Sequence, residues 1–268
     1  MFNMRRTWGP LPTYPKVVEA KSTFGPNLIV VAGPCSVEDG EQMNEIVPVL
    51  RECGVLFARG GVYRAGTYPG RAFGFKKELA EEWARKCHEV SLGVVVEILD
   101  IRQIEDIDKL ADAFQVGARH MQDYALLSEL AKTTKPVFLK RNMGATLDEF
   151  LGAAEYLVRG KPSVVLVERG SSTHMNHVRW DLSVSTIAAL KSMTKLSVLI
   201  DPSHGTGRHD LVKAMTFAGV AAGADGFMVE VHPDPERSLS DAEQAYPLEG
   251  LKGLVTKAQS LRQVLREE

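Results

Sequence analysis

Four residues of the chain carry groups that commonly bind transition metals: Cys35, His204, Glu230 and Asp241. A thiolate, an imidazole and two carboxylates together form the ligand set of a divalent transition metal. The mixture of sulfur, nitrogen and oxygen donors suits Mn²⁺, Fe²⁺, Co²⁺ or Zn²⁺ better than Mg²⁺. A lone histidine or cysteine is more often structural, so the prediction requires a fold that brings the four together. We expect His232 to contact a ligand rather than the metal itself.

Four cations, Arg59, Arg119, Lys140 and Arg169, form a second group, and each follows an apolar run of strand length. Arginine binds phosphate and carboxylate oxygens through two parallel hydrogen bonds, whereas lysine acts as a mobile point charge. Each cation by itself would be an ordinary ion-pair partner. Four cations that converge would repel one another unless an anion bound between them. We therefore predict a phosphorylated, carboxylated substrate.

Short apolar runs that alternate with amphipathic stretches must position both groups. The apolar runs predict strands at residues 28–32, 56–59, 94–99, 114–116, 136–140, 164–168, 197–200 and 226–231. The amphipathic stretches predict helices at residues 41–52, 76–90, 126–133, 147–159, 182–193 and 211–221. Continuous apolar strands that alternate with helices indicate parallel strands buried on both faces, and the number of units predicts a (β/α)₈ TIM barrel. A doubly wound open sheet is disfavoured, because GPCSVEDG after the first strand lacks the G-x-G-x-x-G spacing.

In a barrel of this type the active face is built from the C-terminal ends of the strands. The first, seventh and eighth strands become neighbours when the barrel closes, which would bring three of the four ligand candidates together. The fourth, Asp241, lies in the loop after the eighth strand. Glu97 and Asp201 add carboxylates at the ends of two further strands. We assign residues 27–268 to the barrel and residues 1–26 to an N-terminal extension, expected to be a cap or an oligomer contact.

Composition limits the classes of partner and the compartment. The chain has 268 residues, 44% of them hydrophobic, which is enough for one large buried core. A formal net charge of −2 gives no reason to expect nucleic acid or an anionic membrane as a partner. No apolar run approaches the ~20 residues of a membrane span, and the N-terminus does not resemble a secretory signal. Three widely spaced cysteines argue against a disulfide framework and favour the cytoplasm, with Cys53 and Cys87 as small buried hydrophobic side chains.

Seven short motifs resemble those of 3-deoxy-D-arabino-heptulosonate 7-phosphate (DAHP) synthases, in the short single-domain form that is also similar to 3-deoxy-octulosonate 8-phosphate synthase. They are GPCS (33–36), GAR (117–119), LKR (139–141), ERG (168–170), DPSHGTGR (201–208), AAGADGFMVEVHP (221–233) and LSD (239–241). The resemblance runs from about residue 27 to 260. It implies a barrel that condenses phosphoenolpyruvate (PEP) with an aldose phosphate. In DAHP synthases this aldose is erythrose 4-phosphate, and the reaction opens the shikimate pathway to the aromatic amino acids.

The resemblance also implies roles for individual residues. The metal ligands of the family fall on Cys35, His204, Glu230 and Asp241, and its PEP-binding cations fall on Arg59, Arg119, Lys140 and Arg169. Cys35 favours a metal-dependent enzyme, because metal-free octulosonate synthases have Asn at this position. Proton transfer needs an acid and a base near the metal, for which the candidates are Glu97, Lys140, Asp201 and His204. Because the family is commonly dimeric or tetrameric, a homodimer or homotetramer is expected.

The loop after the second strand departs from the family. DAHP synthases usually have Lys-Pro-Arg-Thr-Ser there, whereas this chain has RAGTY at residues 64–68. Arg64 replaces a lysine beside PEP and the aldehyde and is kept as a catalytic candidate. Gly66 replaces the arginine that grips the aldose phosphate, while Thr67 remains as a substrate-binding candidate. Arg71, in the same loop, or Arg208 could reach back into the site as a substitute cation.

Three different functions therefore stay open. The first is the same chemistry on a different aldehyde acceptor, in secondary metabolism, since the altered loop should contact the acceptor. The second is a Schiff-base aldolase that uses Lys140, which would explain neither Cys35 nor His204. The third is a non-catalytic relative that only binds ligands, although loss of function would rarely spare every ligand and cation. His120 is a further departure, because the family usually has Asn after GAR.

Overall fold

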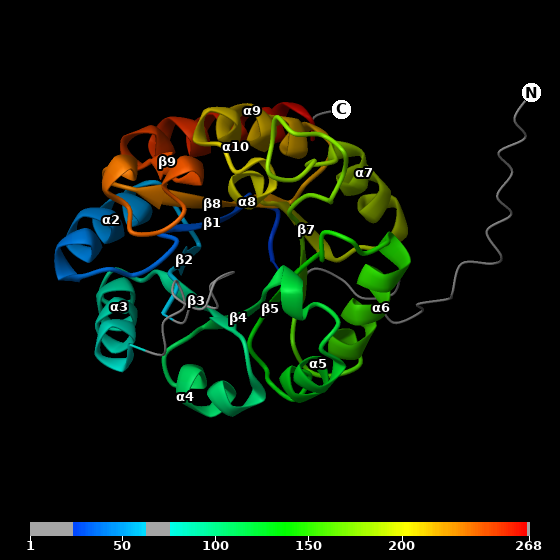
Figure 1. The fold of residues 1–268 in the computed structure, drawn as a ribbon, viewed down its shortest axis with the longest axis horizontal. Helices are drawn as coiled ribbons and strands as arrows, with labels where there is room; N and C mark the ends of the chain where they lie inside the picture. Colours follow the sequence, from blue (N-terminus) through cyan, green and yellow to red (C-terminus); the bar gives the residue numbers. More distant parts are fainter. Residues whose placement is uncertain (1–23, 63–75, 267–268) are drawn as a thin grey trace, which may run out of the picture.

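The computed structural model describes residues 24–62 and 76–266 and shows a closed parallel barrel (Figure 1). Neighbouring strands pair in the order β1 to β8, and β8 pairs with β1 to close the barrel. The strands are β1 (Ile29–Gly33), β2 (Phe57–Arg59), β3 (Gly93–Ile98), β4 (Ala113–Val116), β5 (Val137–Lys140), β6 (Val164–Glu168), β7 (Ser197–Ile200) and β8 (Gly226–His232), with a short outer strand β9 (Tyr246–Pro247) paired with β8. The predicted (β/α)₈ barrel is confirmed.

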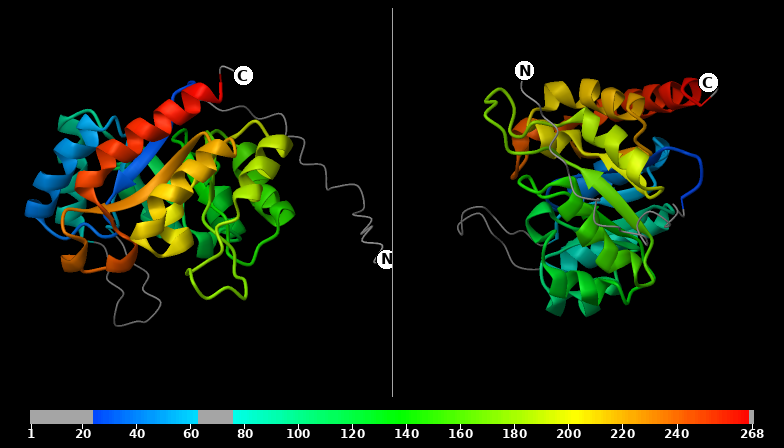
Figure 2. Two further views of the ribbon diagram at one scale, coloured as in Figure 1. Left: turned by 90° about the horizontal axis from the view of Figure 1, so that it is seen from above. Right: turned by 90° about the vertical axis from the view of Figure 1, so that its right-hand side faces the viewer.

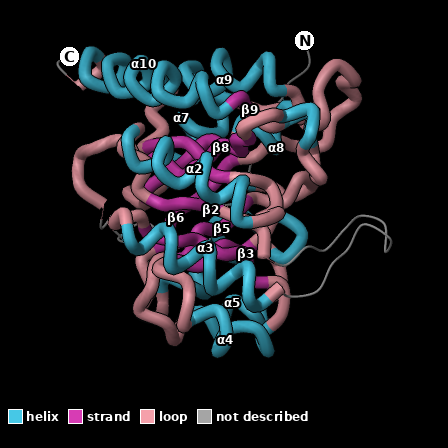
Figure 3. The backbone as a smooth tube through the Cα atoms, turned by 90° about the vertical axis from the view of Figure 1, so that its left-hand side faces the viewer, coloured by secondary structure: helices cyan, strands magenta, loops and turns pink. Residues whose placement is uncertain are grey.

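Helices surround the barrel and cover the outer face of the strands, as Figure 3 shows in cyan around magenta. They are α2 (Gly40–Glu52), α3 (Lys77–Glu89), α4 (Ile104–Asp108), α5 (Tyr124–Leu130), α6 (Leu147–Val158), α7 (Val184–Met193), α8 (Pro202–Thr206), α9 (His209–Ala221) and α10 (Leu251–Val264). Short 3₁₀ turns lie at Ile101–Gln103, Ala118–His120, Pro235–Arg237, Ala242–Gln244 and Leu248–Gly250. Figure 2 shows α10 beside α9 on the outside of the barrel.

Alternate residues of the strands face two different parts of the core. In β1, for example, Val30 packs outward among the helices, while Val31 belongs to the cluster inside the barrel. This alternation follows from the two-residue period of a strand, and burial of both faces explains the continuous apolar runs. Phe24 packs edge-on against Phe57, with ring centroids 6.1 Å apart, and lies 6.5 Å from Phe138. Among the residues predicted to form the N-terminal extension, this one therefore contacts the interior of the barrel.

The segment DPSHGT, which has no helical period in the sequence, contains the short helix α8. The Asp201 side chain accepts a hydrogen bond from the His204 backbone and caps the first turn. Pro202 occupies the first turn, where its missing N–H costs nothing. Gly207, with φ of 67°, ends the helix in the left-handed conformation. The cap and terminator confine His204 to a rigid turn directly after β7.

Among the residues that the structure describes, no helix combines the length and the apolar character that a membrane span requires.

Candidate active site

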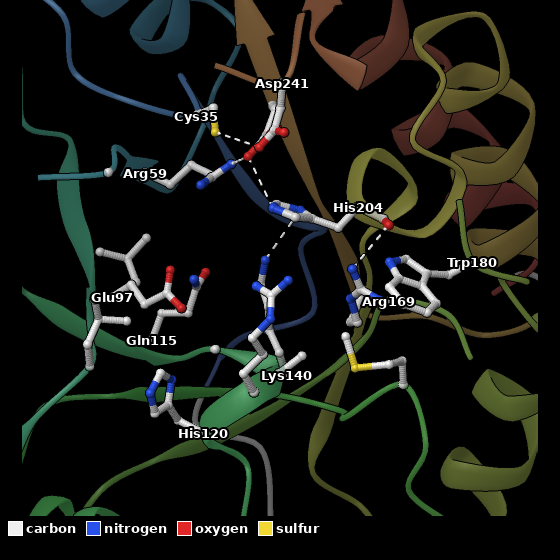
Figure 4. A pocket seen from close by; sticks show the side chains of 18 of the residues that line it. Cys35, Arg59, Glu97, Gln115, His120, Lys140, Arg169, Trp180, His204 and Asp241 are labelled. Carbon is white, nitrogen blue, oxygen red and sulfur yellow. Dashed lines mark hydrogen bonds and ion pairs between the residues drawn. The ribbon is translucent and has the colours of Figure 1, made fainter. Parts of the chain in front are cut away.

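A pocket opens at the C-terminal ends of the strands, and most of the predicted site residues line it (Figure 4). Its predicted lining residues are Cys35, Arg59, Glu97, Arg119, Lys140, Arg169, His204, Glu230 and Asp241. Asp201 lies directly behind this wall, in contact with Lys140 and His204. Arg64, Thr67 and Arg71 lie outside the described residues.

Three of the four predicted metal ligands meet at one side of the pocket. One ligand atom from each of Cys35, Glu230 and Asp241 lies within 4.8 Å of the other two. The Cys35 thiol donates to Asp241 Oδ2 at 3.3 Å. His204 joins this cluster through Glu230, because its Nε2 lies 3.1 Å from Glu230 Oε1. A thiol, an imidazole and two carboxylates at these positions fit a divalent transition metal ion.

Two unusual backbone conformations place the outer members of this cluster. Gly33 has φ of 152°, and a Cβ there would lie 1.9 Å from the Arg59 carbonyl oxygen, so only glycine fits. This close approach lets the chain turn from β1 toward Cys35. Asp241 has φ of 48°, in the left-handed region that Asp adopts more readily than most residues. Such local strain is commonly kept where a side chain has to be aimed into a site.

The protonation of this cluster follows from its burial and its charges. Burial, helped by the charge of Glu230, raises the pKa of the Cys35 thiol well above its usual value. Burial alone would also raise the pKa of Glu230, but His204 and Arg59 hold the pKa of its carboxyl well below the usual range. The carboxylate is therefore ready to bind a cation. The thiol would have to release its proton to do the same.

The cations lie around the same pocket at different depths. Arg59 is buried and forms an ion pair with Glu230. Arg169 is 5% exposed, and burial lowers its pKa to about 10. Its Nη2 donates to the His204 carbonyl at 3.2 Å, and its guanidinium lies 5.2 Å from the centre of the Trp180 ring. Its Nη1 is buried and has no hydrogen-bond partner within the described part of the chain, so an anion in the pocket would supply the missing acceptor.

Lys140, Asp201 and His204 form a buried network beside the metal-ligand candidates. Lys140 Nζ lies 2.7 Å from Asp201 Oδ2, and His204 Nδ1 lies 2.8 Å from the same oxygen. Burial alone would raise the pKa of Asp201, but the charges of His204 and Lys140 hold the pKa of its carboxyl well below the usual range. The anion thus fixes the His204 ring with Nε2 toward Glu230. Carboxylates orient metal-binding histidines in the same way.

Glu97, Gln115 and His120 form the opposite wall, at the ends of β3 and β4 (Figure 4). The Glu97 carboxylate rests against Gly117, where a Cβ would come within 1.9 Å of Glu97 Oε1. His120 Nδ1 is buried and has no hydrogen-bond partner among residues 24–62 and 76–266. This wall therefore presents both hydrogen-bond donors and hydrogen-bond acceptors opposite the cations.

Two predictions differ from the structure. Arg208 pairs with Asp210, with Nη2 2.5 Å from Oδ2, and lines a neighbouring groove, so the prediction that it reaches into the pocket is wrong. His232 Nε2 lies 3.6 Å from Glu38 Oε2, and its Nδ1 accepts a hydrogen bond from the Asp234 backbone. These contacts hold His232 away from the pocket lining.

The cysteines outside the pocket behave as predicted. Cys53 and Cys87 are buried, at 7% and 0% exposure, and both are free thiols. Burial raises the pKa of Cys87 to about 12, which keeps the thiol neutral and unreactive.

A buried ion pair supports the cationic side of the pocket from behind. Arg141 Nε and Nη2 donate to the two oxygens of Glu168 at 2.5 and 2.8 Å. Arg141 also donates to the Ala145 carbonyl at 2.8 Å and to Ser171 Oγ at 2.5 Å. Because Glu168 directly precedes Arg169, this pair fixes the end of the strand that carries the pocket arginine.

Known proteins are similar to this chain in both sequence and fold. The model of the DAHP synthetase I family matches residues 18–267. A phospho-2-dehydro-3-deoxyheptonate aldolase of Thermotoga maritima is 38% identical over 237 residues, covering 88% of this chain and 70% of that protein. A 2-dehydro-3-deoxyphosphooctonate aldolase of Desulfotalea psychrophila is 27% identical and covers 91% of this chain and 92% of its own length.

Solved structures give the same assignment. The crystal structure of the Thermotoga maritima DAHP synthase superposes with a TM-score of 0.85 at 37% identity, covering 90% of this chain and 71% of that one. A truncated form of the Thermotoga maritima synthase superposes with a TM-score of 0.82 at 36% identity, covering 90% and 88% of the two chains. The chain therefore belongs to the DAHP synthetase I family, as a transferase that carries out a PEP-dependent aldol condensation with an aldose phosphate.

Proposed function

We propose that the chain is a metal-dependent DAHP synthase, which condenses PEP with erythrose 4-phosphate to give DAHP and phosphate. One observation carries the proposal: the cluster of Cys35, Glu230 and Asp241 shares a pocket with the buried cations Lys140 and Arg169. PEP carries a phosphate and a carboxylate, which arginine and lysine bind well. A divalent metal beside such an anion site suits the activation of an aldehyde.

The cations Arg59, Arg119, Lys140 and Arg169 would bind the phosphate and the carboxylate of PEP. Arg169 Nη1, which has no hydrogen-bond partner among the described residues, would donate to one of these groups. Mn²⁺, Fe²⁺, Co²⁺ or Zn²⁺, held by the four ligand candidates, would supply Lewis-acid polarisation of a carbonyl oxygen. Negative charge develops on the aldehyde oxygen as PEP attacks, and the Lys140 side chain in the pocket wall would stabilise it. Preorganised charge of this kind is usually the largest contribution to catalysis.

Two groups are placed to move protons. Lys140 Nζ lies in the pocket wall, 2.7 Å from Asp201 Oδ2, and would donate a proton toward the oxygen of the new alcohol. Glu97, on the opposite wall, would accept a proton from the water that adds to C2 of PEP. Phosphate would then leave C2, and the cations would stabilise its charge.

A different aldehyde acceptor is the second candidate, because the loop at residues 64–68 lacks the arginine that the family uses on the aldose phosphate. A Schiff-base aldolase has less support, since that reaction would use neither Cys35 nor His204, which line the same pocket as Lys140. A purely binding relative would have no need of the oriented network of Lys140, Asp201 and His204. A cytoplasmic homodimer or homotetramer remains our prediction.

Incubation of the protein with Mn²⁺, PEP and erythrose 4-phosphate tests the proposal, with PEP followed by its ultraviolet absorbance. We expect PEP consumption with release of one phosphate per PEP. If PEP is consumed with another aldose phosphate but not with erythrose 4-phosphate, the proposed acceptor is wrong and the proposed type of reaction is retained. Cys35→Ala should abolish metal-dependent turnover, and full activity of this variant in metal-free buffer would contradict the metal assignment.

A further inference from the structure

Gln244 is a buried amide that contacts one of the candidate metal ligands without belonging to the ligand set. It is 2% exposed. Its Nε2 donates to Glu230 Oε2 at 2.5 Å, and its Oε1 accepts a hydrogen bond from Arg179 Nη1 at 3.0 Å. The amide therefore connects a ligand candidate inside the pocket to an arginine at the pocket wall.

Only a side chain with both a donor and an acceptor satisfies this position. The ionised Glu230 carboxylate only accepts hydrogen bonds, and the Arg179 guanidinium only donates them. The two contacts determine the orientation of the amide, because the NH₂ group must face the carboxylate and the carbonyl must face the arginine. A glutamate at this position would repel Glu230. An apolar side chain would remove the hydrogen bonds to Glu230 Oε2 and from Arg179 Nη1.

The amide holds one oxygen of Glu230 while the other faces the metal-ligand cluster. Oε1 contacts Arg59 and lies 3.1 Å from His204 Nε2. The Glu230 backbone is also fixed, since its N–H donates to Ser203 Oγ at 3.0 Å. With the backbone held, the Glu230 carboxylate can still move by rotation about the bonds of its side chain. The hydrogen bond from Gln244 to Oε2 restricts that rotation.

The same short turn also carries a second ligand candidate. Gln244 ends the 3₁₀ turn Ala242–Gln244, and its backbone N–H donates to the Asp241 carbonyl at 3.1 Å. Residues three apart in a 3₁₀ turn project to the same side. Arg179 Nη1 lies 4.0 Å from Asp241 Oδ1 as well. One arginine thus contacts both the ligand candidate and the buried amide that this turn presents.

We infer that Gln244 is a positioning residue of the metal site, which orients Glu230 and is itself held by Arg179. This role rests on the proposed metal dependence. Partners that hydrogen-bond to ligating groups typically change metal affinity by about 10- to 100-fold when they are removed. Gln244→Met keeps the volume of the side chain and removes both hydrogen bonds. We expect it to raise the Kd for Mn²⁺ by about 10- to 100-fold.

The test is calorimetric titration of Mn²⁺ into the metal-free full chain. The variants are Gln244→Met, Arg179→Met and the double substitution, with Thr216→Val as a control. Thr216 is also fully buried, and its hydroxyl donates to the Val212 carbonyl at 2.8 Å, in helix α9 outside the pocket lining. Melting temperatures in metal-free buffer separate general destabilisation from loss of metal binding. A merely structural role would lower the melting temperature and leave the Kd near that of the control.

The expected pattern is a weaker site in Gln244→Met, a smaller effect in Arg179→Met, and an effect of Arg179→Met in the double variant that is smaller than its effect alone, since only its contact with Asp241 then remains. An unchanged Kd in Gln244→Met overturns the inference. If Gln244→Met does not fold, Arg179→Met decides, because this side chain is 38% exposed and tolerates substitution; an unchanged Kd there overturns the inference too. Failure of the wild-type protein to bind Mn²⁺ would instead contradict the proposed function.

Discussion

Removal of the Arg141 guanidinium should destabilise the barrel strongly, because it leaves Glu168 charged and buried. The two side chains are 5% and 0% exposed. Arg141→Leu removes both hydrogen bonds to the carboxylate, whose remaining partner among the described residues is the Gly170 N–H at 2.8 Å. Breaking a buried ion pair from one side typically costs about 3–5 kcal/mol. For a domain of this size, that loss corresponds to a fall in Tm of roughly 6 to 20 °C.

The chain contains a matched control for this substitution. Arg85 and Glu89 also form an arginine–glutamate pair at 2.5 Å, but their side chains are 57% and 58% exposed. Arg85→Leu should therefore cost about 0–1 kcal/mol, as exposed pairs do. The double variant Arg141→Leu/Glu168→Leu should recover part of the loss, since it removes the uncompensated charge.

Urea unfolding followed by circular dichroism, on the metal-free protein at pH 7, would measure these free energies. We expect a large loss for Arg141→Leu, a small one for Arg85→Leu and partial recovery in the double variant. Equal losses at the exposed and the buried pair would refute the dependence on burial. A double variant less stable than Arg141→Leu would show that the lost packing matters more than the stranded charge.

Three further predictions concern ligands. Trp180→Leu should raise the KM for PEP roughly 2- to 30-fold with little change in kcat, because Arg169 loses the ring that it stacks on; a fall in kcat alone would contradict this. Lys140→Met should lower kcat at least ~100-fold in single-turnover assays if its ammonium donates a proton, and a near-normal kcat would exclude that role. Mn²⁺ affinity should rise from pH 6 to pH 8, approaching about tenfold per pH unit, because burial raises the pKa of the Cys35 thiol and the metal must displace its proton. Cys35→Ser should flatten this dependence in calorimetry, and pH-independent binding by the wild type would rule it out.

The strands could be predicted from the sequence because parallel strands buried on both faces form continuous apolar runs. The bounds predicted at residues 164–168 and 197–200 match β6 and β7, and the other barrel strands differ by one or two residues. With the strands placed, their C-terminal ends located the pocket residues Glu97, Lys140 and Arg169 without any further information. This step depends only on the geometry of the barrel.

The rest of the site depends on loop paths that have no periodic signal. Trp180, Arg179 and Gln244 come from loops after β6 and β8, so their distance along the sequence says nothing about contact with the pocket. Gln115 could have been found, because it is the inward-facing polar residue of β4, two residues before Gly117. The helix α8 could not have been predicted from periodicity, because five residues are too few to show a helical period. Only its Asp-Pro start is a recognised signal for the beginning of a helix.

Anomalous diffraction from crystals soaked with Mn²⁺ and PEP tests the central claim most directly. We predict one strong manganese peak within coordination distance, roughly 2.0–2.6 Å, of Cys35 Sγ and of donor atoms of His204, Glu230 and Asp241. We also predict PEP in the same pocket, with an anionic oxygen on Arg169 Nη1. A manganese peak elsewhere, or PEP bound away from these cations, would contradict the proposed site.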